Sequence, residues 1–210
     1  FCKSLLVCVF AVMVIGACSG VGVIRGIIAS APTIDDIVAT PTGFLSTVLD
    51  ANGNQTATLV ASGSNRRAVT IDEIPKNLQH AFVAIEDERF YEHNGIDVTG
   101  IIRAGVKGVA SGFHFSEGAS TITQQLLKNT VFTSWTSESS MADKFERKFQ
   151  EQYLALQLEK VVDKDWILEN YLNAINLGQN TLGVGVASER YFGKDVSDLT
   201  LSECAVLAAI

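Results

Sequence analysis

The pattern of apolar and polar residues changes twice along this chain and divides it into three parts. The first part contains an uncharged run of twenty residues, 5–24, which as a helix of about 30 Å can cross the apolar core of a bilayer. We therefore predict a transmembrane anchor over residues 1–31. A cleaved signal peptide, a lipid anchor at Cys18 and a buried core helix are the alternatives. The run is longer than the apolar region of a usual signal peptide.

Residues 32–75 form the second part, which we interpret as an extended connector with a small β-hairpin. They contain all three prolines and many small polar residues. Two short β-like runs, 44–49 and 56–60, flank Asn52-Gly53, a dipeptide that strongly favours a hairpin turn.

From Pro75 onward, apolar positions recur every three or four residues, which is typical of amphipathic helices. We predict helices over 76–89, 97–110, from about 120, over 141–162 and 164–176, a short helix before Tyr191, and one opening at Thr200. The expected inward faces are Leu78, Phe82 and Ile85; Ile101, Ile102 and Val106; and Phe145, Phe149, Tyr153 and Leu156. Thr121 with Gln124, and Thr200 with Glu203, match a capping box. The predicted fold class is therefore mainly α, with a folded domain over 76–210.

The amino-acid composition argues against several classes of protein and of binding site. The 210 residues are 47% hydrophobic, enough for a sizeable core, and the net charge of −7 argues against a nucleic-acid binder. The four cysteines suggest neither a disulfide framework nor a metal site. His80, His93 and His114 do not have metal-ligand spacing either.

A first polar cluster runs from Glu86 to Gly95. Glu86 falls near the end of a predicted helix, where its carboxylate can face a cleft and exchange a proton with a ligand. His93 lies in a polar turn and is expected to orient the loop. The alternative is that the cluster is an ordinary solvated, acidic helix end.

A second polar cluster, 118–125, places a glycine loop before a helix N-terminus, where backbone N–H groups attract anions. Gln125 and Lys128 are three residues apart and share one helix face. An ordinary capped helix is the alternative. No Gly-Lys-Ser/Thr run of the nucleotide-binding type is present.

Arg147 and Glu151 form an i,i+4 pair on a predicted helix. As a surface ion pair they would contribute only about 0.3–0.5 kcal/mol. In the functional interpretation, Glu151 is a second carboxylate that faces Glu86 across a cleft. Two carboxylates with separate roles are the minimal equipment for chemistry at a glycosidic bond.

Taken together, five ordered motifs resemble the peptidoglycan glycosyltransferases of family 51, the transglycosylase domains of class A penicillin-binding proteins and of monofunctional transglycosylases. They are Glu86-Asp87-x-x-Phe90-x-x-His93-x-Gly95; Gly118-x-Ser120-Thr121-Ile122-Thr123-Gln124-Gln125 with Lys128-Asn129; Arg147-Lys148-x-x-Glu151; Ile167-Leu168-Glu169-x-Tyr171-Leu172-Asn173; and Leu199-Thr200-Leu201. The resemblance covers about residues 70–210. It departs at Asn176-Leu177-Gly178, where the family often has an aromatic residue, and the fifth motif is incomplete at Ile210.

The resemblance implies a lysozyme-like glycosyltransferase domain with a membrane-facing jaw, acting on lipid II and a growing glycan strand. It implies that Glu86 is the general base, and that Glu151 lies near the donor pyrophosphate or an attending cation. Lys128, Arg103, Arg147 and Ser120 become candidates for phosphate contact. The other implied substrate-binding residues are Asp87, Phe90, His93, Gly118, Thr121, Thr123, Gln124, Gln125, Asn129, Lys148 and Asn173.

The resemblance also implies a setting. The protein would cross a bacterial cell membrane once, with its catalytic domain outside the cytoplasm, in contact with membrane lipid and with other cell-wall synthesis proteins. No tightly bound cofactor and no protein metal site is expected, although Mg²⁺ or Mn²⁺ could accompany the pyrophosphate. Whether a transpeptidase domain follows Ile210 stays open.

Two other functions compete with glycan synthesis. A lytic enzyme of the same fold class would cleave glycan and would need no pyrophosphate site. A non-catalytic membrane scaffold would need neither carboxylate. The cationic residues around Lys128 and Arg147 argue against the first, and the presence of both glutamates gives no support to the second.

Overall fold

A computed structural model describes residues 2–34, 39–61, 63–112 and 118–210, without the side chains of residues 2–9, 11 and 12. The described chain is mainly α with one two-stranded hairpin, as the sequence predicts, and it agrees with a lysozyme-like domain. The helices are α1 (Cys2–Ala29), α2 (Lys76–Glu86), α3 (Val98–Ala110), α4 (Ile122–Thr130), the 3-10 helix η2 (Thr133–Ser137), α5 (Met141–Leu158), α6 (Lys164–Ala174), α7 (Val184–Phe192), the 3-10 helix η3 (Val196–Asp198) and α8 (Leu201–Ala208). The strands are β1 (Ser46–Leu49) and β2 (Gln55–Leu59).

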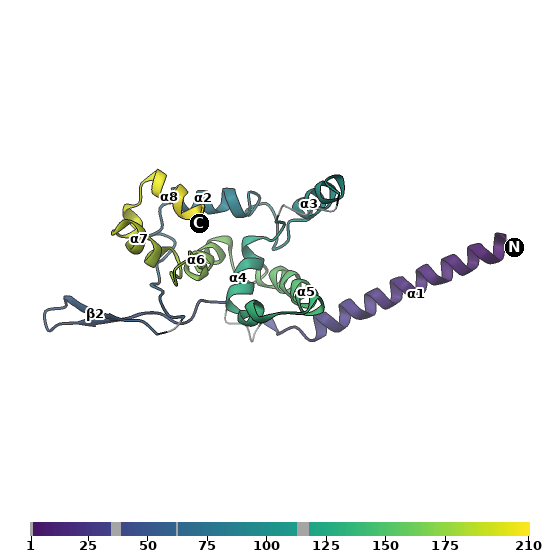
Figure 1. The fold of residues 1–210 in the computed structure, drawn as a ribbon, viewed down its shortest axis with the longest axis horizontal. Coiled ribbons are helices and arrows are strands. Elements are labelled where there is room, and N and C mark those ends of the chain that lie inside the picture. The colour runs from purple at the N-terminus through teal and green to yellow at the C-terminus, as the bar shows by residue number, and fades with distance from the viewer. Residues whose placement is uncertain (1, 35–38, 62, 113–117) are drawn as a thin grey trace.

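Helix α1 projects from one end of the molecule, opposite the hairpin (Figure 1). Its C-terminal end packs on α5, where the side-chain amide of Gln150 donates to the backbone oxygen of Ile27 (3.2 Å) and to the hydroxyl of Ser30 (3.0 Å). The transmembrane span is predicted at residues 5–24. Within it, the side chains of residues 5–9, 11 and 12 lie outside the part that the structure describes. Within the part of the chain that the structure describes, no helix is long and apolar enough to cross a membrane, so the predicted span is not confirmed.

The hairpin predicted in the connector is confirmed. Strands β1 and β2 pair antiparallel, with Ser46 opposite Leu59 and Leu49 opposite Gln55. The Asp50 carboxylate accepts hydrogen bonds from the backbone N–H groups of Asn52 (2.8 Å) and Asn54 (2.9 Å), which closes the turn.

Helix α4 lies at the centre of the helical domain, between α5 and α6 (Figure 1). Helices α2 and α8 pack against each other above α6 (Figure 1). Each fully buried leucine in this core stabilises the fold by about 1.5–3 kcal/mol. The large, fully buried apolar residues are Ile74, Leu78, Phe90, Ile122, Leu126, Leu127, Leu154, Ile167, Leu168, Leu172 and Leu207.

The predicted inward face of α3 is wrong. Ile102 is 60% exposed, Val106 is 64% exposed, and Ile101 is exposed as well. Helix α3 stands apart from the core helices (Figure 1), and its buried positions are the glycines Gly100 and Gly108. The apolar face therefore has no protein partner among the described residues.

The predicted faces of α2 and α5 are right only in part. On α2, Leu78 and Phe82 are buried, but Ile85 is exposed where the helix ends at a cavity. On α5, Phe145 and Leu156 are exposed. The buried positions on α5 are Gln150, Glu151, Leu154, Ala155 and Leu158. Gln150 and Glu151 are polar, and their side chains form hydrogen bonds or ion pairs with other groups of the protein. The buried face of α5 is therefore not its most apolar face.

Candidate functional site

Glu86 is the last residue of α2, and its side chain is exposed there. The helix ends three residues earlier than predicted because Asp87 leaves helical geometry (φ −159°, ψ 73°). The side-chain amide of Gln125, on α4, donates to Glu86 Oε2 at 2.7 Å. Glu86 lines two neighbouring cavities. An oriented, exposed carboxylate in this position can take a proton from a ligand hydroxyl.

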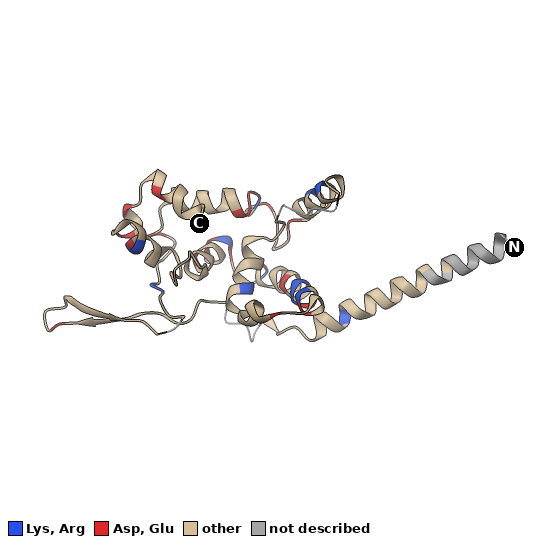
Figure 2. Ribbon diagram, viewed as in Figure 1, with Lys and Arg blue, Asp and Glu red and all other residues tan. Residues whose placement is uncertain are grey.

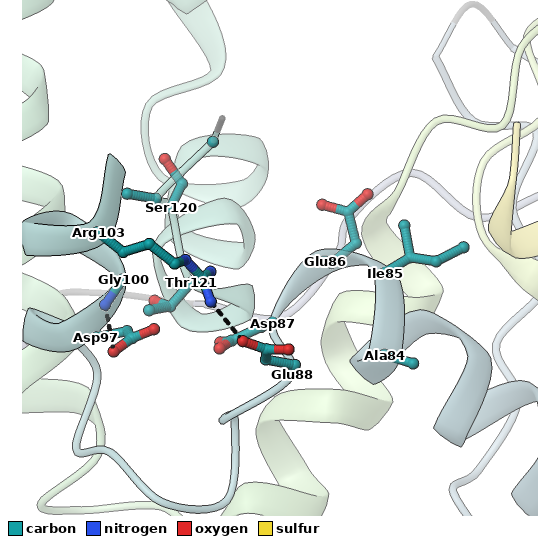
Figure 3. A pocket seen from close by; sticks show the side chains of 12 residues that line it. Ala84, Ile85, Glu86, Asp87, Glu88, Asp97, Gly100, Arg103, Ser120 and Thr121 are labelled. Atoms are coloured by element: carbon teal, nitrogen blue, oxygen red, sulfur yellow. Dashed lines mark hydrogen bonds and ion pairs between the residues drawn. The ribbon is translucent and has the colours of Figure 1, made fainter. Parts of the chain in front are cut away.

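The smaller cavity has a volume of about 140 Å³ and lies between the end of α2, helix α3 and the loop before α4 (Figure 3). Arg103 Nη1 donates to Glu88 Oε1 at 2.6 Å within it (Figure 3). Ligand pockets usually measure about 300–1,000 Å³, so this cavity can hold only part of a ligand. Its predicted site residues are Glu86, Asp87, Arg103, Gly118, Ser120 and Thr121.

The larger cavity has a volume of about 540 Å³, within the usual range for ligand pockets. Gln125 and Lys128 both line it, as their shared helix face predicts. Burial raises the pKa of the Tyr171 hydroxyl, and the charges of Glu86 and Asp87 raise it further, so the phenol stays protonated at neutral pH. The polar and aromatic lining is Glu86, Gln125, Lys128, Asn129, Trp135, Tyr171 and Asn176, with Phe82 beside them.

Lys128 is a partly buried cation at the wall of the larger cavity. Among the described residues it forms no ion pair and no hydrogen bond, and its ammonium lies 4.5 Å from the centroid of the Trp135 ring. Burial lowers the pKa of Lys128 and the nearby charge of Lys148 lowers it further, whereas Glu151 and Glu86 act in the opposite direction. Lys128 is thus within electrostatic range of both predicted carboxylates, and its unpaired charge can attract an anionic ligand.

Basic residues gather on α5 (Figure 2), where they surround Glu151. Arg147 Nη1 pairs with Glu151 Oε1, and Lys148 Nζ lies 2.7 Å from Glu151 Oε2 and 3.1 Å from Ser120 Oγ. Arg147 Nε also donates to both carboxylate oxygens of Glu138, at 2.8 and 3.0 Å. Burial alone would lower the pKa of Arg147, but the hydrogen bonds to Glu138 and Glu151 outweigh it and raise the pKa.

The surface interpretation of the Arg147–Glu151 pair is wrong, because the side chain of Glu151 has no exposed surface. Glu151 is not among the residues that line the two cavities, and its position opposite Glu86 across a cleft stays a prediction. Both of its oxygens are engaged by cationic side chains, which leaves a poor fit for a divalent cation at this carboxylate. Within the described residues, which exclude His114, no group of three or more His, Cys, Asp or Glu side chains could hold a metal ion.

The buried residues of the first motif stabilise the loop that follows Glu86 through hydrogen bonds and packing. Asp87 accepts hydrogen bonds from His93 Nε2 (2.9 Å) and from the backbone N–H of Ile122 (3.0 Å), the first residue of α4. The backbone N–H of Gly95 donates to His93 Nδ1 at 3.2 Å, which assigns the ring proton to Nε2. Phe90 is fully buried in the core. These contacts fix the loop that follows Glu86 against the start of α4.

The buried residues of the second motif hold α4 in the same way. Thr121 caps the helix by accepting from the backbone N–H of Gln124 (3.2 Å), and its hydroxyl donates to the Gly95 oxygen at 2.8 Å. The Gln124 side chain bonds to Gly95 rather than back to Thr121, so only half of the predicted capping box forms. Thr123 Oγ1 donates to Glu159, whose carboxylate pairs with Lys164.

Asn173 lies on α6, away from both cavities, and joins the connector to the helical domain. Its side-chain amide donates to the Val69 oxygen (2.8 Å), and its side-chain oxygen accepts from the Val69 N–H (3.0 Å). Arg66 Nε donates to its backbone oxygen at 2.7 Å. The predicted substrate contacts of these buried residues stay predictions.

Three further residues around the cavities were not predicted as site residues. Trp135 and Tyr171 line the larger cavity, and Glu138 holds Arg147. Tyr171 lies within the fourth motif, so that motif could have indicated it. Trp135 and Glu138 belong to a stretch after α4 without helical periodicity, and no sequence pattern marks them.

Comparison with known proteins gives a matching family model and several similar relatives. The family model described as transglycosylase matches residues 52–210. Penicillin-binding protein 1A of Clostridium perfringens is 44% identical over 213 residues, covering 100% of this chain and 30% of the relative. Penicillin-binding protein 1F of Bacillus subtilis is 46% identical over 166 residues, covering 79% of this chain and 22% of the relative. The chain thus spans less than a third of the length of these relatives.

Proposed function

The chain belongs to the transglycosylase family, and we propose that it polymerises lipid II into β-1,4 glycan strands of peptidoglycan, with inversion and release of undecaprenyl pyrophosphate. We further propose that it is the glycan-polymerising part of a longer penicillin-binding protein, because it covers 30% or less of such relatives.

One observation carries the proposal. Glu86 lines both cavities, and the larger cavity also contains Lys128, a cation without a counter-ion among the described residues. A base and an unpaired cation in one cavity suit a reaction in which a hydroxyl loses a proton and a phosphorylated leaving group gains negative charge. A lytic enzyme would have no use for the cation.

These positions support the following reaction as part of the proposal. Glu86, oriented by Gln125, removes the proton from the 4-hydroxyl of the acceptor N-acetylglucosamine. The oxygen forms a bond to C1 of the muramoyl sugar at the reducing end of the growing strand, from the face opposite the leaving group. The C1–O bond to the pyrophosphate breaks, and the pyrophosphate leaves with the bonding electron pair. Lys128, with Lys148 and Arg147 within electrostatic range of it, offsets the charge that develops.

The role of Glu151 in this proposal is to hold cations rather than to bind a metal. Its two oxygens fix Arg147 and Lys148, and Lys148 in turn reaches Ser120 beside the smaller cavity. Mg²⁺ or Mn²⁺, if it accompanies the pyrophosphate, would find its oxygen ligands on the substrate. No step of the reaction is assigned to it.

The exposed apolar face of α3 supports the membrane-facing jaw. We define the α3 stripe as Val98, Ile102, Val106 and Val109, which recur at helical spacing and are all exposed. Such a stripe suits insertion into the boundary of a lipid bilayer, where the undecaprenyl chain of the substrate lies. With α1 as the proposed single anchor, the domain would sit on the outer face of the bacterial cell membrane.

The first test uses the full-length protein in detergent with labelled lipid II. We expect Glu86→Gln to abolish polymer formation, with a loss on the order of 10²-fold or more, because the base is removed while shape is kept. Glu92→Gln is the matched control, since Glu92 is exposed on the following turn and lines neither of the two cavities.

Each outcome decides between the functions. Long glycan strands from wild type and Glu92→Gln, but not from Glu86→Gln, establish the polymerase with Glu86 as base. Degradation of isolated cell walls without lipid II would identify a lytic enzyme instead. Folded protein that neither builds nor cleaves glycan would identify a scaffold.

A further inference from the structure

Trp135 is the aromatic residue of η2, and the residue is 37% exposed at the wall of the larger cavity. The backbone on either side holds the turn in place. The N–H of Trp135 donates to the Phe132 oxygen (3.0 Å), and the N–H of Glu138 donates to the Trp135 oxygen (3.4 Å). Glu138 is tied to Arg147 in turn. The ring is therefore presented by a fixed segment.

The ring lies under the ammonium of Lys128, at 4.5 Å from the centroid. A lysine has four rotatable side-chain bonds and needs a partner to keep one position. The neighbouring charges of Lys148 and Arg147 repel this ammonium, and no described acidic side chain pairs with it. The face of the indole ring attracts a cation without neutralising it, so the charge stays available to a ligand.

We propose that Trp135 is a positioning residue that holds the Lys128 ammonium in the larger cavity, ready to receive a phosphate or pyrophosphate group. The assignment rests on the proposed function, because it places the anionic group of the substrate at Lys128. A carboxylate in the place of Trp135 would also hold the lysine, but it would cancel the charge that the ligand needs.

The test compares two replacements of Trp135 in the full-length protein, with inorganic pyrophosphate as the probe and calorimetry as the readout. Trp135→Phe keeps an aromatic face, whereas Trp135→Leu keeps only apolar bulk. We expect Trp135→Leu to weaken pyrophosphate binding about threefold to tenfold and Trp135→Phe to retain most of it, the range that a cation–π contact supports. Melting temperatures of all variants control for the fold.

A double-mutant cycle separates positioning from a general packing role. In the Lys128→Met background, Trp135→Leu should cause no further loss, because the cation that it positions is gone. An equal loss in both backgrounds would overturn the proposal. Equal losses from Trp135→Phe and Trp135→Leu, or no pyrophosphate binding by the wild type, would overturn it as well.

The experiments distinguish a failure of the positioning role of Trp135 from a failure of the proposed function. If wild type polymerises lipid II while Trp135→Leu binds pyrophosphate normally, the positioning role fails and the function stands. If pyrophosphate binding depends on Trp135 but no polymer forms, the positioning role stands and the function fails.

Discussion

At the scale of the residue, Gly95 is the point where the loop after Glu86 touches α5. Its φ is +90°, and a Cβ atom there would lie 2.5 Å from the backbone oxygen of Ala155. We expect Gly95→Ala to lower the free energy of unfolding by about 2–5 kcal/mol, the sum of left-handed backbone cost and overpacking. Gly193→Ala is the control, because Gly193 has φ +66° and no atom near its missing Cβ. Thermal unfolding measures both, and equal losses would contradict the packing argument.

Single residues also show how far the sequence predicts the site. Gln125 and Lys128 line the larger cavity, as their spacing on one helix face predicts. Asp87 and Thr123 belong to the same motifs but are buried and bonded internally. The sequence shows that a residue is polar, but it does not show whether the side chain will form its hydrogen bonds with the protein or with a ligand. Tertiary contacts decide between the two. Trp135 reaches the cavity only because η2 folds back over α4, which no local pattern encodes.

At the scale of the element, the sequence predicted where the main helices lie along the chain, but it did not always predict which face of a helix is buried. Periodicity reports which residues share a face, whereas the packing partner decides which face turns inward. On α3 the buried positions are glycines, and on α5 they include Gln150 and Glu151. In both helices the apolar residues that suggested a core face are wholly or partly exposed. The capping box at Thr200 and Glu203 is complete, because both of its bonds are local in sequence.

The start of α5 gives a prediction at this scale, because α5 carries Arg147, Lys148 and Glu151. Ser140 Oγ accepts from the backbone N–H groups of Ala142 (3.0 Å) and Asp143 (3.3 Å). We expect Ser140→Ala to lower the free energy of unfolding by about 1 kcal/mol through loss of this cap. Ser139→Ala is the matched control, since the neighbouring exposed serine caps no helix. Hydrogen exchange in the first turn of α5 should rise in the first variant and not in the second.

At the scale of the whole molecule, the proposed substrate, a polar sugar pyrophosphate on a long lipid chain, would have to reach both the two cavities and the α3 stripe. Figure 1 shows α3 set apart from the core helices, and the cavity that it shares with α2 contains Glu86. If α3 enters the bilayer boundary, the protein presents Glu86 close to the membrane surface. A membrane-bound substrate then needs to move only its headgroup into the cavities.

This arrangement predicts that the α3 stripe matters for a lipid-embedded substrate and not for the chemistry. The double variant Ile102→Gln, Val106→Gln removes apolar area that would be buried in lipid, so turnover of lipid II in vesicles should fall about tenfold or more. Turnover of a short-chain, water-soluble lipid II analogue should stay near wild type, because neither residue lines a cavity that contains Glu86. Val161→Gln is the control for an exposed apolar residue on another surface. Equal losses with both substrates would mean that α3 acts through the catalytic site, and no loss with either would remove α3 from the membrane contact.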